Sequence, residues 1–382
     1  MASLKLNPGN RQRVMQGHPW VYANEVQKLL ASEFNGQAVE CRDAQGRILG
    51  TGLYNGHSQI IWRKISKDKQ EFNSVFIHKT LAAAFLRRRG LTSGRYFWSE
   101  SDGIPGLIID RFESVLVVQF LTMAVDRAQD IILDWLEQEL KPTAIILRND
   151  APSREKEGLL RSVSVGRGTA PSSMWLHFQG VDFLFDWESG QKTGFYLDQC
   201  EQHQKVAAYA NGRRVLDVFC NQGGFALHCA KQGAASVVGV DSSVEAIGLA
   251  KQNSAKNELT ITWICENAFD YLKRQKPNSW DLVILDPPPF AKSRDRLQEA
   301  LGGYKEINLR AMKQLAPGGI LATYSCSHHI SYEIYRQMLM EAAADVGRNV
   351  RLLEMCKQSY DHPVMLNIPE SEYLRGFILE IE

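Results

Sequence analysis

The stretch RRVLDVFCNQGGFALHCAKQGAASVVGVDSS, residues 213–243, decides the fold of the C-terminal half of the chain. It begins with a short apolar run, continues through two glycines into an amphipathic run, and ends with a second apolar run. Short apolar runs bounded by turn residues are typical of buried strands, and the longer amphipathic run is typical of a helix. The stretch therefore predicts a strand, a helix and a second strand parallel to the first.

The same alternation continues downstream of residue 243. Further strands are predicted in ITWICENA (261–268), WDLVILDPP (280–288) and GILATYSCS (319–327), with a helical pattern between each pair. Alternating strands and helices favour a doubly wound, mostly parallel, Rossmann-like sheet. The last two apolar runs, near 349–356 and 373–382, are predicted to form an antiparallel pair at its edge.

The residues before this sheet follow other patterns. Residues 1–70 contain short β-like runs separated by turn signals, which predicts a small β-barrel or sandwich. Residues 71–185 mix amphipathic helices with strands and predict a small α+β domain. With residues 186–382 as the Rossmann-like domain, we expect three domains, as the length of 382 residues also suggests.

Composition narrows the class of protein. Hydrophobic residues make up 44% of the chain and charged residues 23%, as in globular proteins, and no apolar run reaches the roughly 18 residues of a membrane span. The first residues lack the apolar core of a signal peptide, so we expect a cytoplasmic protein with no membrane partner. The seven cysteines form no CxxC pair, so we expect no metal site and mostly buried thiols, Cys220, Cys229 and Cys265 among them.

Residues 1–70 carry an excess of positive charge. Ten basic and five acidic side chains give this segment a net charge of +5, although the whole chain has only +1. Such a local excess suits contact with a polyanion such as RNA. The alternative is a solvated surface without a partner, because modest imbalances are common.

Polar residues and glycines follow the first two predicted strands of the Rossmann-like sheet. Asp217, Phe219, Asn221 and Gly223 come at the end of the first strand, and Asp241 ends the second. A carboxylate at the second strand end can accept hydrogen bonds from both hydroxyls of a ribose. The alternative is that Asp241 only caps the following helix.

After the third strand, Asn267 could pair with an adenine edge beside Ala268, and Ser242 follows Asp241. The glycine loop is neither the GxGxxG of dinucleotide binders nor a P-loop, so a pyrophosphate ligand is not expected. An adenosine nucleoside without phosphate fits this pattern, and S-adenosylmethionine (SAM) is such a cofactor.

Several longer segments carry a family resemblance. ILDPPPFAKS (284–293), GQKTGFYLDQ (190–199), the run from GGYKEINL to TYSCS (302–327) and GHPWVYANEV (17–26) together closely resemble the large-subunit ribosomal RNA methyltransferase I family, which makes 5-methylcytosine. The resemblance covers essentially the whole chain. It implies an N-terminal PUA domain, a central α+β domain, a Rossmann-like SAM domain and 23S ribosomal RNA as partner. It also suggests a homodimer, because PUA-bearing relatives often pair.

The resemblance implies roles for particular residues. A loop covering the cofactor would contain Lys192, Thr193, Phe195, Asp198 and Gln199. The cofactor pocket would contain Asp217, Gly223, Asp241, Asn267 and Asp286, and the target base would meet Pro287, Pro288 and Phe290. Phe290 could instead pack beneath its loop. Family members commonly carry Asp at the position of Asn267, so we expect a retuned adenine contact.

Cys326 in TYSCSHHI is the candidate nucleophile, and Asp286 is the group expected to hydrogen-bond the base. Both follow strand ends and can therefore face one base. Cys326 could also be a core thiol, or a metal ligand with His328 and His329, although that spacing suits a tetrahedral site poorly. Other open alternatives are a guanine or amino-group methyltransferase in which Cys326 is incidental, and a non-catalytic RNA-binding protein.

Overall fold

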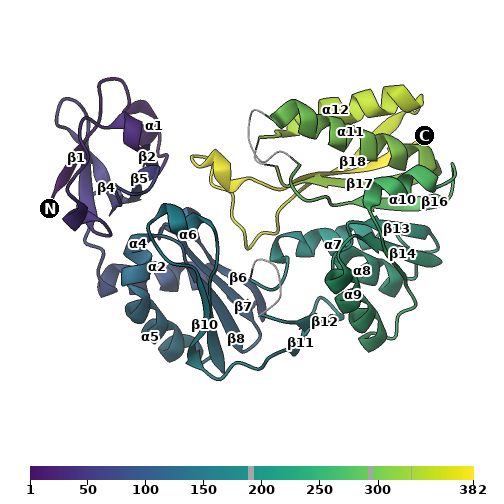
Figure 1. The fold of residues 1–382 in the computed structure, drawn as a ribbon, viewed down its shortest axis with the longest axis horizontal. Helices are drawn as coiled ribbons and strands as arrows, with labels where there is room; N and C mark the ends of the chain where they lie inside the picture. Colours follow the sequence, from purple (N-terminus) through teal and green to yellow (C-terminus); the bar gives the residue numbers. More distant parts are fainter. Residues whose placement is uncertain (188–192, 291–295, 328) are drawn as a thin grey trace. The chain divides into compact units, whose positions relative to one another are not determined.

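The computed structural model describes residues 1–187, 193–290, 296–327 and 329–382, which form two compact units (Figure 1). Unit 1 comprises residues 1–174, 185–195 and 361–371, and unit 2 comprises residues 175–184, 196–360 and 372–382. The chain thus passes from one unit to the other five times. The domain boundaries expected at residues 70 and 185 stay a prediction.

The first sheet of unit 1 lies within residues 1–70, as the turn-rich β pattern predicts. Its strand order is β1-β3-β4-β5-β2. The strands are β1 (Ser3–Lys5), β2 (Trp20–Tyr22), β3 (Ala38–Arg42), β4 (Ile48–Tyr54) and β5 (Ile60–Ser66), with the short helices α1 (Gln12–Met15), η1 (Ala23–Glu25) and η2 (Ser32–Phe34) between them. Trp62 and Tyr54 are its largest buried side chains, and the Trp62 indole N–H donates to the Val39 carbonyl.

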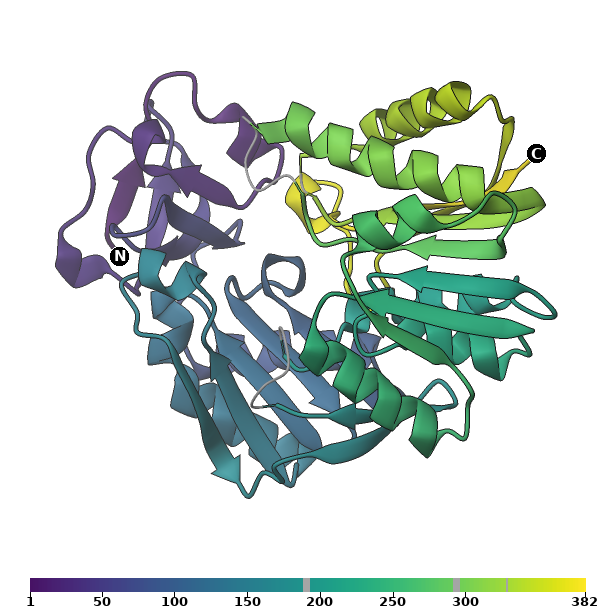
Figure 2. The same ribbon diagram turned by 45° about the vertical axis from the view of Figure 1, so that its right-hand side comes forward.

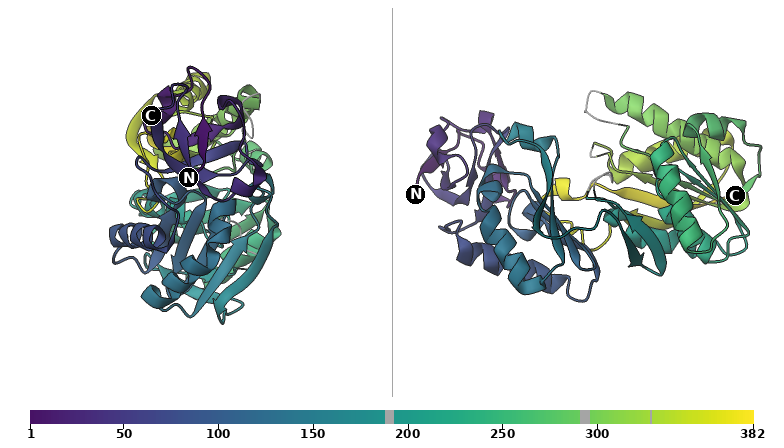
Figure 3. Two further views of the ribbon diagram at one scale, coloured as in Figure 1. Left: turned by 90° about the vertical axis from the view of Figure 1, so that its left-hand side faces the viewer. Right: turned by 60° about the horizontal axis from the view of Figure 1, so that its bottom comes forward.

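The second sheet of unit 1 has the order β10-β9-β8-β7-β6. Its strands are β6 (Ser93–Trp98), β7 (Leu107–Phe112), β8 (Val115–Phe120), β9 (Ala144–Asn149) and β10 (Ser162–Gly168). The helices of this part are α2 (Ser74–Arg87), α3 (Ser99–Asp102), α4 (Met123–Arg127), α5 (Gln129–Leu140) and α6 (Ser153–Lys156). Apolar residues of α2 and α5 pack with those of the sheet in one core, which confirms the expected α+β architecture. The ribbon of this part of the chain can be followed in Figure 3.

A segment from near the C-terminal end, residues 361–371 with η5 (Pro369–Ser371), also belongs to unit 1. The Asp361 carboxylate accepts a hydrogen bond of 2.7 Å from the Arg95 backbone N–H. His18 and Glu370 lie 3.0 Å apart, Nε2 to Oε2. These polar contacts bind the segment to strand β6 and to the residues before β2.

Unit 2 is built on a seven-stranded sheet with the order β15-β14-β13-β16-β17-β19-β18 (Figure 2). The strands are β13 (Arg214–Val218), β14 (Ser236–Asp241), β15 (Thr262–Cys265), β16 (Trp280–Leu285), β17 (Leu315–Ser325), β18 (Val350–Lys357) and β19 (Arg375–Ile381). The first five are parallel, and β19 lies antiparallel between β17 and β18. The doubly wound sheet and its antiparallel pair are therefore confirmed.

Helices cover both faces of this sheet. Apolar side chains of α10 (Ala268–Arg274), α11 (Leu297–Gln314) and α12 (Tyr332–Val346) pack against the sheet in one core. Those of α7 (Cys200–Ala207) and α8 (Gly224–Lys231) pack against it in a second core. Helix α9 (Val244–Lys256) connects β14 to β15, η3 (Leu197–Gln199) precedes α7, and β11 (Met174–Phe178) pairs with β12 (Val181–Phe185). Within the described residues, no helix combines the length and the hydropathy that crossing a membrane requires.

Candidate functional site

The carboxyl end of β13 holds a deeply buried acid, Asp217, in unit 2. Its side chain has no solvent exposure, and its Oδ2 accepts a hydrogen bond of 3.0 Å from the Ala226 N–H in the first turn of α8. Burial raises the pKa of Asp217 to about 8, with the nearby charges of Asp286 and Asp241 adding to the shift and the Ala226 N–H opposing it. Its Oδ1 has no hydrogen-bond partner among the described residues.

Asp241, at the end of β14, is held by backbone groups. Its Oδ2 accepts from the Asn221 N–H and its Oδ1 from the Ser243 N–H, each at 2.9 Å. The cap of α9 is Ser243, whose Oγ accepts from the Ala246 N–H at 3.1 Å. The capping role considered for Asp241 is therefore filled by Ser243, and the partly exposed carboxylate is left oriented at the sheet edge.

The glycine loop between β13 and α8 has an unusual backbone. Phe219, Asn221 and Gly223 have φ angles of +66°, +47° and +90°. At Gly223 an added Cβ would lie 2.6 Å from Cη2 of Trp263. Only glycine satisfies both the left-handed conformation and this close approach, so the loop is fixed close to the sheet.

The residues after β15 are more open. Asn267 is exposed, and its Oδ1 accepts from the Phe269 N–H at 2.9 Å as the cap of α10. A contact with adenine would have to share this oxygen or use the amide nitrogen. Ala268 is buried and Ser242 is exposed.

Residues of the expected cofactor loop fall in both units. Thr193, in unit 1, is buried and donates a hydrogen bond of 2.6 Å to Asp110, and Phe195 of the same unit is also buried. Asp198 and Gln199 belong to η3 of unit 2, where both are buried. Lys192 lies outside the described residues. Their joint role at a cofactor therefore stays a prediction.

Two loops meet where β16 and β17 end. Asp286 follows β16, and its N–H donates to the Val218 carbonyl at 3.4 Å. The Cys326 sulfur, directly after β17, lies 3.9 Å from the carbonyl oxygen of Pro287 and donates a weak hydrogen bond to it. The Cys326 thiol therefore lies beside the loop that starts at Asp286. That the two groups face one base stays a prediction.

The rest of that loop is aromatic and proline-rich. Pro287 is buried and Pro288 is exposed. Phe290 is partly buried, and its ring centroid lies 4.6 Å from that of Tyr304, 6.0 Å from Phe269 and 6.4 Å from Phe219. These contacts favour packing beneath the loop over stacking on a base.

The cysteines differ in exposure. Cys220 and Cys229 are buried, as expected, and burial raises the pKa of both thiols. The expectation for Cys265 is wrong, because this residue is exposed at the end of β15. Cys326 is partly exposed, so it is not a fully buried core thiol. His328, the second member of the alternative metal site, lies outside the described residues.

Two tyrosines near this edge were not singled out from the sequence. Burial raises the pKa of the Tyr196 hydroxyl, and the nearby charges of Asp286 and Asp198 raise it further. The Tyr373 hydroxyl donates a hydrogen bond of 2.9 Å to Asp198 Oδ2. Tyr196 stands inside the segment GQKTGFYLDQ, so the sequence offered a reason to consider it. Tyr373 lies in no such motif, and nothing in the sequence points to it.

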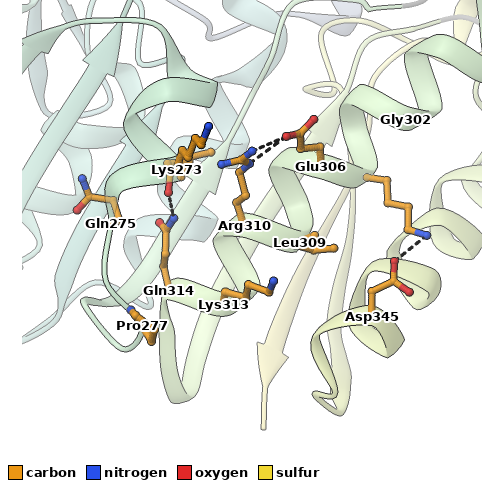
Figure 4. A pocket seen from close by; sticks show the side chains of 12 residues that line it. Lys273, Gln275, Pro277, Gly302, Glu306, Leu309, Arg310, Lys313, Gln314 and Asp345 are labelled. Carbon is orange, nitrogen blue, oxygen red and sulfur yellow. Dashed lines mark hydrogen bonds and ion pairs between the residues drawn. The ribbon is translucent and has the colours of Figure 1, made fainter.

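A hollow of about 600 Å³ lies elsewhere in unit 2, between α10, α11 and α12 (Figure 4). Lys273 and Lys313, which line it, precede β16 and β17. The hollow therefore lies toward the amino ends of these strands, opposite the edge with Asp286 and Cys326. Arg310 pairs with Glu306 in its wall.

Features of the carboxyl edge fit an adenosine nucleoside. The Asp241 carboxylate is fixed by two backbone N–H groups, and the Asp217 Oδ1 lacks a partner. In η3, both amide atoms of Gln199 are also buried without a partner among the described residues. Buried polar atoms without partners are costly, so a polar ligand at this edge would offset that cost.

Ion pairs occupy all five arginines of residues 1–70. The pairs are Arg11–Asp43, Arg13–Glu25, Arg42–Glu40, Arg47–Asp43 and Arg63–Glu100. Within the described part of the chain, no ion pair involves the exposed lysines Lys5, Lys28, Lys67 and Lys69. The excess positive charge of this segment is therefore carried by lysines open to solvent.

Comparisons with known proteins identify the family of the chain. The model of the S-adenosylmethionine-dependent methyltransferase family matches residues 167–366, and that of the PUA-like domain matches residues 4–67. Ribosomal RNA large subunit methyltransferase I of Aeromonas hydrophila is 36% identical, with 99% of each chain covered.

Two solved structures share the fold over the whole length of both chains. A protein from Streptococcus mutans described as a SAM-dependent methyltransferase has a TM-score of 0.84, and a methyltransferase complexed with SAH has a TM-score of 0.86, each at 18% identity. The match to the curated relative confirms the resemblance carried by the motifs, and the match to the family model confirms SAM as cofactor. The chain belongs to the ribosomal RNA large subunit methyltransferase I family of SAM-dependent methyltransferases, with a PUA-like domain at residues 4–67.

Proposed function

We propose that this chain methylates carbon 5 of a cytosine in 23S ribosomal RNA, with Cys326 as a transient covalent nucleophile. The observation that carries the proposal is the 3.9 Å approach of the Cys326 sulfur to the Pro287 carbonyl. It brings the thiol to the loop that begins at Asp286. Relatives that bear the name of the large-subunit ribosomal RNA enzyme support the choice of RNA.

The chemistry explains why a thiol is needed. Carbon 5 of cytosine is a weak nucleophile, and addition of the Cys326 thiolate to carbon 6 moves electron density onto carbon 5. SAM, when bound, would supply an electrophilic methyl group to carbon 5, and the electron pair of the broken S–CH3 bond would stay on its sulfur as a thioether. A base then removes the proton from carbon 5, and the electron pair of that bond restores the ring double bond as the thiolate leaves. Asp286 hydrogen-bonds the N3/N4 edge and stabilises the charge that develops on addition.

We assign the binding of SAM to residues at and near the ends of β13, β14 and β15. Asp241 would accept hydrogen bonds from the ribose hydroxyls. The bound cofactor would also give the buried amide of Gln199 a hydrogen-bond partner. Asn267 would face the adenine beside Ala268. Thr193, Phe195 and Asp198 remain proposed members of the loop over the cofactor.

RNA binding is proposed for residues 1–70. The exposed lysines Lys5, Lys28, Lys67 and Lys69 would contact phosphates, which fix the position of an RNA without reading its sequence. The target base must leave its stack to reach Cys326. The homodimer suggested by the family stays a prediction.

The test is mass-spectrometric mapping of ribosomal RNA from cells that lack the gene and receive it back as wild type or as Cys326→Ala. We expect one 5-methylcytosine with the wild type and none with the variant, which still binds SAM in calorimetry. Cys265→Ala, a change of an exposed thiol, is the control and should methylate normally.

Other outcomes would select other functions. Full methylation by Cys326→Ala would exclude covalent catalysis. A methyl group on guanine or on an exocyclic amino group would replace the cytosine proposal, and a wild-type chain that binds no SAM would favour a non-catalytic RNA-binding role.

A further inference from the structure

Tyr304 lies in α11, the helix that connects β16 to β17. These are the two strands whose carboxyl ends carry Asp286 and Cys326. The Tyr304 side chain is fully buried. A buried side chain of a crossover helix normally serves only as core, so its contacts decide whether it does more.

The ring of Tyr304 contacts the first loop. It packs against Phe290 with a centroid distance of 4.6 Å and an interplanar angle of 44°. The neighbouring Gly303 leaves room for this contact, because a Cβ there would lie 3.3 Å from Phe290 Cδ2. Phe290 is four residues after Asp286 in the same loop, so the ring supports that loop from below.

The hydroxyl of Tyr304 contacts the second loop. It lies 3.0 Å from Ser327 Oγ, at a position where both residues are buried. The Ser327 N–H donates to Ser325 Oγ at 3.3 Å and closes a short turn. Cys326 is the residue between these two serines, so the hydroxyl is bonded to the turn that presents the thiol.

We propose that Tyr304 is a positioning residue that holds the Asp286 loop and the Cys326 turn in one fixed arrangement. The proposal rests on the proposed function and deepens it. The thiol–carbonyl contact between the loops is a weak hydrogen bond, whereas ring packing and a buried hydroxyl bond restrain both loops from one rigid helix. Catalysis depends steeply on such restraint, because a displacement of about 1 Å can cost about a hundredfold in rate.

The test is Tyr304→Phe, which keeps the ring and removes only the hydroxyl. We expect kcat for 5-methylcytosine formation to fall about tenfold to a hundredfold. The dissociation constant for SAM and the KM for RNA should change less than about twofold. Ser327→Ala should lower kcat similarly, and the double variant should be no slower than the slower single one, because both remove one interaction.

Tyr335→Phe is the matched control. Tyr335 is also fully buried, and its hydroxyl donates to the Tyr324 carbonyl at 3.0 Å and lies 2.7 Å from Thr323 Oγ1. Its loss should destabilise the core about as much as the loss of the Tyr304 hydroxyl. Its kcat should nevertheless stay within about twofold of the wild type, so a drop specific to Tyr304→Phe cannot come from lost stability.

The wild type and Cys326→Ala are assayed beside these variants. If the wild type makes no 5-methylcytosine, or Cys326→Ala makes it at full rate, the proposed function fails. If both behave as proposed but Tyr304→Phe is as fast as the wild type, or Tyr335→Phe is as slow as Tyr304→Phe, the positioning role fails alone. Additive losses in Tyr304→Phe and Ser327→Ala would also overturn it.

Discussion

The two halves of the carboxyl edge in unit 2 are fixed by different kinds of contact. In the half formed by β13 and β14, backbone N–H groups hold the carboxyl groups: Ala226 binds Asp217, and Asn221 and Ser243 bind Asp241. In the half formed by β16 and β17, side chains of Phe290, Tyr304 and Ser327 restrain the loops. A site made by the backbone should tolerate side-chain changes except where only glycine fits, whereas a site made by side chains should not.

The largest expected effect comes from Gly223→Ala. The new Cβ would lie 2.6 Å from Trp263, at a φ of +90°. Left-handed strain and overpacking together predict a loss of about 2–4 kcal/mol in the free energy of unfolding, measured by urea titration. SAM binding, measured by calorimetry, should weaken as the loop is displaced.

Gly248→Ala is the control for this change. Gly248 lies inside α9, and a Cβ there would meet nothing within 4 Å. The replacement should stabilise the helix by up to about 1 kcal/mol. Equal behaviour of the two alanine variants would show that the glycine loop is not fixed by its backbone.

The next effect concerns pH and Asp217. Burial raises the pKa of this carboxyl from 3.8 to about 8, so the folded chain keeps its proton while the unfolded chain loses it. The stability that it contributes is therefore present below pH 4 and is lost as the pH rises to about 8. Asp217→Asn stays neutral, so without SAM its melting temperature should rise relative to the wild type between pH 5 and pH 8.5. Parallel pH profiles would contradict the raised pKa.

The smallest effect is expected for Ser243, which we compare with Ser327. Ser243→Ala removes the cap of α9 and should cost about 1 kcal/mol of stability. It keeps the backbone N–H that binds Asp241, so the SAM dissociation constant should stay within about twofold. Ser327→Ala, in the other half, should lower kcat. If Ser243→Ala instead abolished SAM binding, the contrast between the two halves would be lost.

Much of the fold can be predicted from local patterns. Buried parallel strands are short apolar runs, and the order of runs and helices gives β13 to β17 without knowledge of contacts. Asp217, Asp241 and Asp286 could be found because each stands at or just past the end of such a run. The start of β17 could not be placed, because Leu315–Gly319 contains Pro317 and two glycines and is typical of a turn, yet Leu315 pairs with Trp280.

Some residue roles could not be predicted from the sequence, because they depend on contacts between segments that lie far apart in the chain. Thr193 stands in a segment quoted for cofactor binding, but its partner is Asp110, far away in the chain. Cys265 follows an apolar run and still lies exposed, because β15 is the edge strand of the sheet. Tyr304 is indistinguishable from a core residue until Phe290 and Ser327 are seen beside it.

The position of β19 affects how the sheet is completed during synthesis. β18 precedes β19 in the chain, yet in the described sheet it pairs only with β19, which lies between it and β17. Until residues 375–381 emerge from a ribosome, β17 keeps an open edge that ends at Ser325. Ser325, the residue before Cys326, therefore gains its strand partner Arg375 only when translation has reached β19.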